Sequence, residues 1–276
     1  MQHSSPLNVQ SIERHLNTRS LGRRIVLHDR IESTNREAVA LGHAGVEHGT
    51  LVLADAQTSG RGRMARSWFS PPGVNLYASL VIRTAINAER MTEWLSWLPL
   101  MAALSAAQAI ESVTKEPIAI KWPNDLLIHE RKMGGILCES GSSATAGPFQ
   151  VIGIGINVNG ALEDFPDDLR PFATTIRHET GGVIDRNRLM AHLLIELESS
   201  LERFLSCGAD ALTIAYRRRC TTIGKAVKAV LADGTEYMGV AEGIEEDGSL
   251  ILLQQAVGAS PPMTRKLRAA DIVHLR

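Results

Sequence analysis

The longest apolar strand-type run of the chain, residues 149–158, constrains the fold more than any other stretch. It reads FQVIGIGINV and offers almost no polar side chain for a solvent-facing side. A strand of this composition is buried on both faces, and such strands lie inside a sheet. We therefore expect residues 149–158 near the centre of a β-sheet.

Shorter patterns supply the rest of the sheet and its covering layers. Strand-type runs occur over residues 24–28, 50–54, 75–83, 118–122, 126–129 and 132–140, with a loop of small residues expected over 141–148. Apolar residues at helical spacing predict long helices over residues 90–114, 186–205 and 209–219. A shorter helix over 36–41 can be capped by Ser33 or Thr34. The order of these elements indicates an α+β fold, a mixed β-sheet packed by helices.

Near Cys220 the sequence changes from long helical patterns to short strand-type runs. After it, short strands over 227–231, 236–244 and 250–253 are separated by two Asp-Gly pairs at 233–234 and 247–248, and such pairs favour tight hairpin turns. We expect three parts: an N-terminal extension over residues 1–23, a main domain over 24–220, and a small antiparallel barrel over 221–276. The extension, with one short helix around residues 11–17, is too short to fold alone.

The charge balance and the cysteines narrow the class of protein. The chain has 29 Lys and Arg and 30 Asp and Glu, so its net charge of −1 disfavours broad non-specific binding to nucleic acid. Its three widely spaced cysteines indicate neither a disulfide framework nor a zinc site. Met1–Val9 lacks the pattern of a secretory signal, and no apolar run reaches the ~18 residues of a membrane span. We expect a reduced, cytoplasmic protein without a membrane partner.

The first segment with chemical character is Gln57–Trp68, which reads QTSGRGRMARSW. Its glycines bring bare backbone amides close to a ligand, and Arg61, Arg63 and Arg66 add planar cationic donors that suit phosphate. Neighbouring cations repel one another unless an anion joins them, which favours a phosphate-rich ligand. A solvated basic loop or an RNA-contacting stretch is the competing interpretation.

The second segment is Lys121–Asp125, KWPND, followed by Lys132–Leu137, KMGGIL. Pro123 ends a strand, so Asn124 and Asp125 fall at the strand end. Asp125 can orient an amine, accept its proton or help to hold magnesium, and the sequence does not choose among these roles. Lys132 can supply positive charge to a reacting carboxylate and phosphate. An Asn-Asp turn with an exposed lysine is the alternative.

The third segment, Ile152–Asn159, reads IGIGINVN. It superficially resembles a dinucleotide-binding glycine motif, but the third glycine and the following helix are absent. Glycines inside a central strand instead indicate the close approach of a ligand or of another backbone. Asn157 can bond an adenine edge or a phosphate, and plain strand packing is the alternative.

Taken in order, Ser33-Thr34-Asn35 and these three segments resemble the biotin–protein ligase family, over residues from about 25 to 276. The resemblance implies a catalytic domain like that of the class II synthetases, followed by an SH3-like β-barrel. It also implies that biotin is activated by ATP to biotinyl-5′-AMP and transferred to a lysine of a biotin carboxyl carrier protein. Biotin and ATP would be substrates, accompanied by Mg²⁺.

The same resemblance gives individual residues expected roles. Biotin would contact Ser33, Thr34, Asn35, Gln57, Arg61, Gly62, Arg63, Lys132 and Gly135. ATP would contact Arg63, Arg66, Trp68, Asn124, Lys132 and Asn157, and magnesium would reach Asp125 through the phosphates. The catalytic residues would be Arg61, Arg63, Lys132 and Asp125.

Two departures from the family pattern are visible. Ala65 stands where the family's loop, GRGRxGRxW, often has a glycine. Some members carry an N-terminal DNA-binding domain, whereas only some 23 residues precede the first expected strand here, so DNA binding is not expected. The sequence leaves the choice between a monomer and a homodimer open.

Three alternatives compete with this interpretation. Lipoate ligases and octanoyl transferases share the implied fold, although they lack the combination of KWPND and GRGR. A nucleic-acid-binding protein that uses Arg61–Arg66 and the C-terminal barrel is disfavoured by the near-neutral charge and by an aromatic content of 4%. An inactive relative is disfavoured because each expected catalytic position holds a chemically competent residue.

Overall fold

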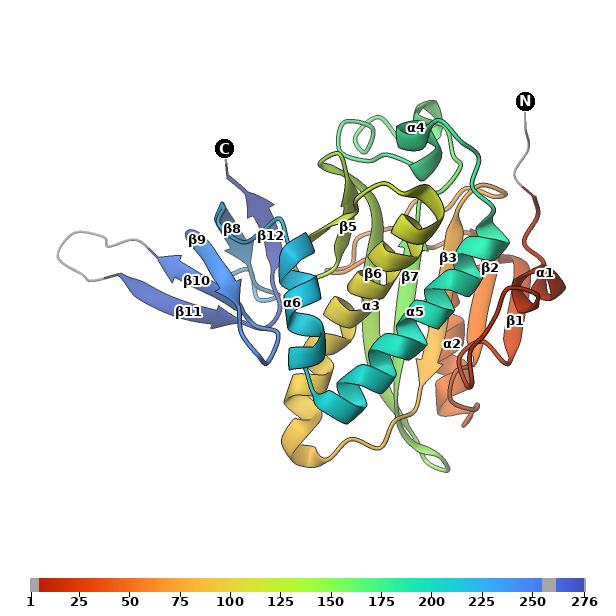
Figure 1. Ribbon diagram of the computed structural model, residues 1–276, viewed down its shortest axis with the longest axis horizontal. Helices are drawn as coiled ribbons and strands as arrows, with labels where there is room; N and C mark the ends of the chain where they lie inside the picture. Colours follow the sequence, from red (N-terminus) through yellow and green to blue (C-terminus); the bar gives the residue numbers. More distant parts are fainter. Residues whose placement is uncertain (1–4, 255–261, 276) are drawn as a thin grey trace.

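The computed structural model describes residues 5–254 and 262–275. Its main layer is a seven-stranded sheet in the order β1-β2-β3-β7-β6-β5-β4 (Figure 1). Strands β1 and β2 are parallel and the other neighbouring pairs are antiparallel, so the sheet is mixed, as predicted. The strands are β1 (Ile25–Ile31), β2 (Leu51–Gln57), β3 (Leu76–Ile82), β4 (Ala119–Lys121), β5 (Asp125–Ile128), β6 (Arg131–Ser143) and β7 (Gly147–Ile156).

Strand β7 contains the long apolar run, and it lies fourth of seven, between β3 and β6. Residues 149–154 are buried, so the expected central strand is confirmed. Strands β6 and β7 form one long hairpin whose ladder continues to the pair Ser143 and Gly147. The loop expected over 141–148 is therefore shorter, because backbone pairing continues through small residues that carry no apolar signal.

Helices cover both faces of this sheet. Helices α3 (Met91–Thr114), α5 (Arg186–Cys207) and α6 (Asp210–Arg219) lie together on one face, and α2 (Thr34–His43) lies on the other (Figure 1). Because neighbouring strand residues point to opposite faces, Ile152 belongs to the core that contains α3 and α5, whereas Val151 packs with Ala38 of α2. Shorter helical turns are α1 (Val9–Glu13), η1 (Ala88–Arg90), η2 (Leu162–Asp164) and α4 (Ile176–Thr180).

A second, antiparallel sheet follows in the order β11-β10-β9-β8-β12. Its strands are β8 (Ala226–Val230), β9 (Glu236–Ile244), β10 (Leu250–Gln254), β11 (Met263–Leu267) and β12 (Asp271–His274). Gly234 and Gly248 have φ of +84° and +83° in the predicted turns. In residues 226–254 and 262–275 we find no ladder between β11 and β12 that would close a barrel. The domain boundary near Cys220 stays a prediction.

The two sheets share one continuous hydrophobic core. Trp97 of α3 donates its indole N–H to the carbonyl oxygen of Glu246 at 2.6 Å. Trp122, directly after β4, donates in the same way to Gly248 at 3.2 Å. The turn between β9 and β10 therefore packs on two buried tryptophans, one from α3 and one next to the edge strand β4 of the main sheet.

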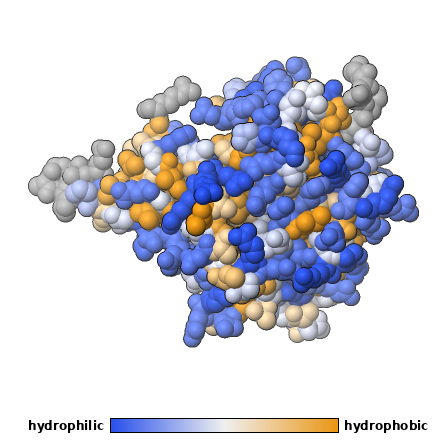
Figure 2. Space-filling view, viewed as in Figure 1, coloured by the Kyte–Doolittle hydropathy of each residue, from blue (hydrophilic) through white to orange (hydrophobic). Residues whose placement is uncertain are grey.

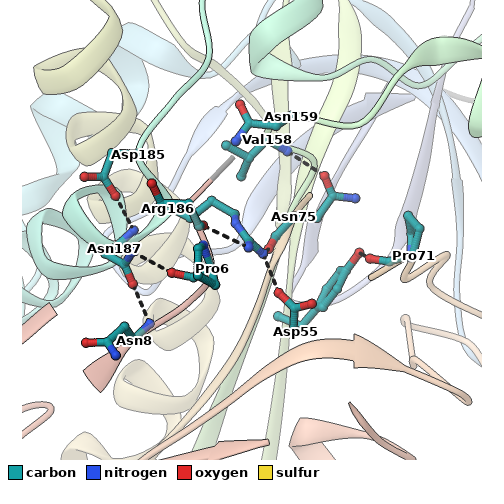
Figure 3. A network of polar contacts seen from close by, with 12 residues as sticks. Pro6, Asn8, Asp55, Pro71, Asn75, Val158, Asn159, Asp185, Arg186 and Asn187 are labelled. Atoms are coloured by element: carbon teal, nitrogen blue, oxygen red, sulfur yellow. Dashed lines mark hydrogen bonds and ion pairs between the residues drawn. The ribbon is translucent and has the colours of Figure 1, made fainter. Parts of the chain in front are cut away.

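The described N-terminal residues are tied to the start of α5 (Figure 3). The guanidinium of Arg186 is 1% exposed and donates to Asp55 of β2 at 2.8 Å and to the carbonyl oxygen of Ser5 at 3.2 Å. Asn187 donates its side-chain amide to the carbonyl oxygen of Pro6 at 3.0 Å. The segment before α1 thus joins the end of β2 to α5.

The helices turn their polar sides outward. Figure 2 shows a mostly hydrophilic face, with hydrophobic residues gathered on the second sheet and scattered over the rest. Across residues 5–254 and 262–275, no helix combines the length and the hydrophobicity that crossing a bilayer requires.

Candidate active site

One cavity gathers most of the residues singled out in the sequence. It encloses about 700 Å³, counting the space at its open mouth, and lies where the N-terminus of α2 meets β2, β5, β6, β7 and the loop after β2. Its lining includes these residues predicted for the site: Ser33, Thr34, Asn35, Gln57, Arg61, Gly62, Arg63, Arg66, Trp68, Asn124, Asp125, Lys132 and Gly135. The fold therefore brings together segments that are far apart in the sequence.

Buried hydroxyl and amide groups form one side of the cavity. Thr34 donates its backbone N–H to Gln57 Oε1 at 2.8 Å, and Gln57 in turn donates to Ser70 Oγ at 3.0 Å. Ser79 of β3 donates to Asn35 Oδ1 at 2.6 Å, and Asn35 Nδ2 donates to Glu139 at 2.8 Å. These bonds hold the first turn of α2 against the sheet and fix the orientation of its polar side chains.

Ser33 and Trp68 carry buried polar atoms whose bonding is incomplete. Ser33 occupies the N-cap position of α2, but its side chain makes no capping hydrogen bond, so the predicted capping role is wrong. Within residues 5–254 and 262–275, Ser33 Oγ and Trp68 Nε1 are buried without a hydrogen-bond partner. Leaving such a group unsatisfied costs about 1–3 kcal/mol. A ligand with its own donors and acceptors would recover that energy.

The two glycines in the middle of β7 make room for side chains. A Cβ on Gly153 would lie 1.9 Å from Asn35 Oδ1, and a Cβ on Gly155 would lie 2.7 Å from the indole of Trp68. The IGIGI pattern predicted the close approach of a ligand or of another backbone, but the groups that approach these glycines are the side chains of Asn35 and Trp68. Both are cavity-lining residues, so these glycines shape the cavity indirectly.

Residues 60–68 form a tight hairpin, which we name the arginine loop. Arg61 pairs with Ser67, and Arg66 N donates to the carbonyl oxygen of Arg63 at 3.2 Å. Met64 and Ala65 between them have φ of 53° and 58°, as in a type I′ turn. Left-handed backbone favours glycine, so Ala65 sits where the family's glycine would be unstrained.

Each arginine of this loop has a different partner. Arg61 donates to the Glu139 carboxylate at 3.0 Å. Arg63 donates to Asn124 Oδ1 at 2.7 Å and to the carbonyl oxygen of Ala270 at 3.1 Å. Arg66 forms an ion pair with Asp271 at 2.5 Å. The loop therefore contacts both the main sheet and the second sheet.

Lys132 and Asp125, which both line the cavity, form an ion pair. Lys132 Nζ lies 2.6 Å from Asp125 Oδ1 and 5.7 Å from the centre of the Trp68 ring. Both charged residues come from the β5–β6 hairpin, where Gly135 pairs with Asp125. The ammonium group is thus fixed beside a flat aromatic surface and open cavity space.

Burial affects the charged groups around the cavity. It lowers the pKa of Arg63 and of Lys121, against the opposing influence of Asp271 and Asp125. A desolvated cation is stabilised by a nearby anion, so the site favours an anionic ligand. Burial also raises the pKa of Cys138 on β6 to about 12. Its thiol stays protonated and does not compete as a nucleophile.

Asn157 lies outside the cavity lining, and two lining residues, Tyr77 and Asp271, were missed from the sequence. Asn157 does not line the cavity, because it lies past the end of β7 and donates its side-chain amide to the carbonyl oxygen of Thr174 at 3.1 Å. Tyr77 does line it, although its position in an alternating strand gave no chemical signal. Asp271 also lines it, from a region in which the sequence showed no reactive cluster.

The described residues contain no group of three or more His, Cys, Asp or Glu side chains that could hold a metal ion by themselves. Magnesium, however, usually binds through one or two carboxylates together with substrate phosphates. Asp125 is a carboxylate at the cavity wall, so the donor set fits an ion that arrives with a phosphate ligand.

Together the fold and the cavity define a domain whose cavity is lined by buried polar groups and by cations. A profile of the Biotin/lipoate A/B protein ligase family matches residues 27–159. The biotin–[acetyl-CoA-carboxylase] ligase of Mycobacterium tuberculosis is 33% identical over 88% of this chain and 86% of its own length. The bifunctional ligase/repressor BirA of Bacillus spizizenii is 36% identical over 93% of this chain and 76% of its own length.

A solved structure gives the same result. The biotin protein ligase from Aquifex aeolicus in complex with biotin and ATP matches with a TM-score of 0.76 and 27% identity, over 92% of this chain and 100% of that chain. The chain therefore belongs to the Biotin/lipoate A/B protein ligase family, and within it to the biotin–protein ligases.

Proposed function

We propose that this chain is a biotin–protein ligase that works in two steps. In the first, an oxygen of the biotin carboxylate attacks the α-phosphorus of ATP, and pyrophosphate leaves as the Pα–O bond breaks. In the second, a lysine amine of a biotin carboxyl carrier protein attacks the carbonyl carbon of biotinyl-5′-AMP. An amide forms, AMP leaves, and the amine proton passes to a nearby base or to water.

The observation that carries this proposal is the division of the cavity into two chemically different sides. Ser33, Thr34 and Asn35 present buried hydroxyl and amide groups beside the half-buried amide of Gln57, whereas the arginine loop and Lys132 present cations. The ureido ring of biotin needs hydrogen-bond partners, and its tail ends in a carboxylate that must approach a triphosphate. One molecule therefore matches both sides at once.

In this proposal the cations offset the negative charge that gathers during the first step. Lys132 would contact the biotin carboxylate and the α-phosphate, beside Gly135 and the biotin tail. Arg61, Gly62 and Arg63 would cover biotin and the adenylate, excluding water that would hydrolyse the intermediate. Arg66, Trp68 and Asn124 would face the nucleotide. Magnesium bound to the phosphates would neutralise charge there, next to Asp125.

The cavity also distinguishes biotin from lipoate, which is the alternative substrate within the family. The dithiolane ring of lipoate has no N–H or carbonyl group, so it would leave Ser33 Oγ, which has no hydrogen-bond partner among the described residues, unsatisfied. Sites that bond a polar group reject analogues without it, because their own buried groups then stay unpaired. The polar side of the cavity therefore favours biotin.

The direct test uses labelled biotin, ATP, magnesium and a carrier domain. We expect label on one lysine of the carrier and release of pyrophosphate when biotin is present. Lys132→Ala should slow adenylation by about 100-fold or more, because it removes charge stabilisation in the transition state. Lys228→Ala, which removes a lysine from an ion pair of the second sheet, should leave the rate unchanged. Pyrophosphate release with lipoate but not with biotin would overturn the proposal.

The location and the assembly are part of the proposal. Cys138, Cys207 and Cys220 are free thiols, which agrees with the cytoplasmic location expected from the sequence. The acceptor is expected to be the carrier domain of an acetyl-CoA-carboxylase-type enzyme, in line with the names of the relatives. Sedimentation of the purified chain would decide between the monomer and the homodimer.

A further inference from the structure

The second sheet reaches the cavity at one point, the start of β12. There Asp271 forms the ion pair with Arg66 at 2.5 Å, and Ala270 accepts a hydrogen bond from Arg63 at 3.1 Å. Asp271 also lines the cavity. Two consecutive residues of the second sheet therefore bond two arginines of the loop that contacts the proposed substrates.

We propose that Asp271 is a positioning residue that holds the arginine loop over the cavity through Arg66. The second sheet then supplies part of the active site and does more than stabilise the fold. This inference rests on the proposed function, because the loop matters for catalysis only if the cavity binds the adenylate.

Among the contacts of residues 5–254 and 262–275, few others hold the tip of the arginine loop. Its internal bonds, Gly62 N to the carbonyl oxygen of Arg66 and Arg66 N to that of Arg63, tie the tip to itself. Met64 at the tip is 44% exposed and adds no core packing. Fixing the tip relative to the sheet therefore depends on the side-chain bonds of Arg63 and Arg66.

The other end of the contact is rigid. Strand β12 is paired with β8 along its length, and Ala270 and Ile272 on either side of Asp271 are each 2% exposed. A carboxylate fixed between two buried neighbours is a firm attachment for a flexible loop. Its charge also acts on Arg63 and on Lys121, so it holds the cationic side of the cavity together.

Limited trypsin digestion tests the proposal without any substrate, because the loop contains three arginines as cleavage sites. In the full chain, Asp271→Asn should raise the rate of cleavage after Arg61, Arg63 or Arg66 by about two- to fivefold, the range expected for a partly exposed ion pair. Glu245→Gln is the matched control, since it removes the carboxylate of an ion pair with Lys266 in the same sheet, away from the loop. It should leave loop cleavage unchanged.

A charge exchange shows whether the pair itself matters. Arg66→Glu alone should expose the loop to cleavage after Arg61 and Arg63, and Arg66→Glu combined with Asp271→Arg should restore the slow rate at these two sites. Arg66→Gln breaks the same ion pair by a change in the exposed loop. Its loop cleavage can therefore be measured even if a substitution at Asp271 disturbs folding. Equal loop cleavage in wild type, Asp271→Asn and Arg66→Gln would overturn the proposal.

The effect on chemistry gives a second readout. Asp271→Asn should release free biotinyl-5′-AMP severalfold faster than wild type, while its affinity for biotin alone, measured by calorimetry, changes less than twofold. If wild type makes no biotinyl-5′-AMP, the proposed function fails, and the digestion still decides whether Asp271 holds the loop. If wild type makes it and the variant retains it equally well, only the role of Asp271 fails.

Discussion

Trp68 and Gly155 show how one pair of residues sets the shape of the cavity. The indole of Trp68 fills the volume that any side chain at position 155 would need. From that position it faces the Lys132 ammonium, and its own N–H is buried without a hydrogen-bond partner in the described part of the chain. The strand glycine is therefore required by a neighbouring aromatic ring, which itself lines the cavity proposed to bind the substrates.

This relation predicts that Gly155→Ala is far more harmful than its size suggests. The added methyl group would displace Trp68, which should reduce adenylation about tenfold and lower the free energy of unfolding by about 1–2 kcal/mol. Pyrophosphate release and urea unfolding measure the two effects. Gly182→Ala is the control, because a Cβ there meets no atom of the described residues within 4 Å. Equal behaviour of the two variants would show that Trp68 does not need this space.

His274 on β12 predicts a pH dependence of stability. Burial, together with the charges of Lys225 and Lys121, lowers its pKa to about 4, against a small opposing influence of Glu130. In the unfolded chain the pKa of His274 is about 6.5. As the pH falls below this value, the unfolded state binds a proton at His274 that the folded state does not. Stability from this group is therefore complete above pH 6.5 and is lost as the pH falls toward 4.

The test is urea unfolding at several pH values between 7.5 and 5. His274→Gln should lose less stability than wild type over this range, because it removes one group that must charge on unfolding. His48 and His192 have pKa values lowered by burial as well, so some dependence should persist in the variant. Parallel curves for the two proteins would contradict the assignment.

At the scale of elements, the arginine loop combines a backbone with positive φ angles and a position in which its side chains contact both sheets. Its type I′ turn has two residues with positive φ, and neither Met64 nor Ala65 is a glycine. The bonds of Arg63 and Arg66, on either side of the turn, to partners outside the loop offset the steric cost of the two positive φ angles.

Ala65→Gly should therefore stabilise the loop in the observed conformation. We expect the free energy of unfolding to rise by about 0.5–1 kcal/mol, and release of biotinyl-5′-AMP to slow, because glycine adopts positive φ without steric cost. Ala40→Gly, at an exposed position inside α2, is the control and should lower stability by about 1 kcal/mol. A loss of stability at both positions would contradict the argument from backbone strain.

Helices and strands with a clear pattern of apolar residues were predictable from the sequence. Strands that are defined only by their backbone pairing with a neighbouring strand were not. The seven strands of the main sheet and the helices α3, α5 and α6 carry apolar patterns, and each was expected near its observed place. Strands β11 and β12 mix charged and apolar residues, so nothing marked them before their ladders with β10 and β8 were seen.

The same division holds for the site. The glycine-, arginine- and lysine-containing segments were visible as motifs, and they do meet at one cavity. Asp271 was invisible because its importance lies in a contact with Arg66, which is distant in sequence. Asn157 lies outside the cavity lining because its position after β7 turns its side chain toward Thr174, a direction that no motif predicts.

At the scale of the whole molecule, the polar network around Arg186 joins α5 and the N-terminal segment to the main sheet (Figure 3). Arg186 at the start of α5 bonds Asp55 of β2 and the carbonyl oxygen of Asn75 before β3. Asp55 lies two residues before Gln57 of the cavity. The network therefore supports the strand end that carries part of the polar side.

Asp55→Ala should destabilise the whole chain by about 3 kcal/mol, because it leaves a buried guanidinium without its carboxylate. Urea unfolding measures this loss. Glu236→Gln, which removes the carboxylate of the more exposed pair with Lys228, should change stability by less than about 1 kcal/mol. A similar small effect at Asp55 would mean that the remaining partners of Arg186 suffice.

The docking of Ser5 and Pro6 onto the start of α5 has a practical consequence for anyone who produces this protein. A purification tag or a fluorescent reporter fused immediately before Ser5 would lie next to the Arg186 guanidinium, which bonds Asp55 of β2. A bulky fusion there would compete with the docking of Ser5 and Pro6 onto α5. A flexible glycine–serine spacer before Ser5 would keep the handle clear of it.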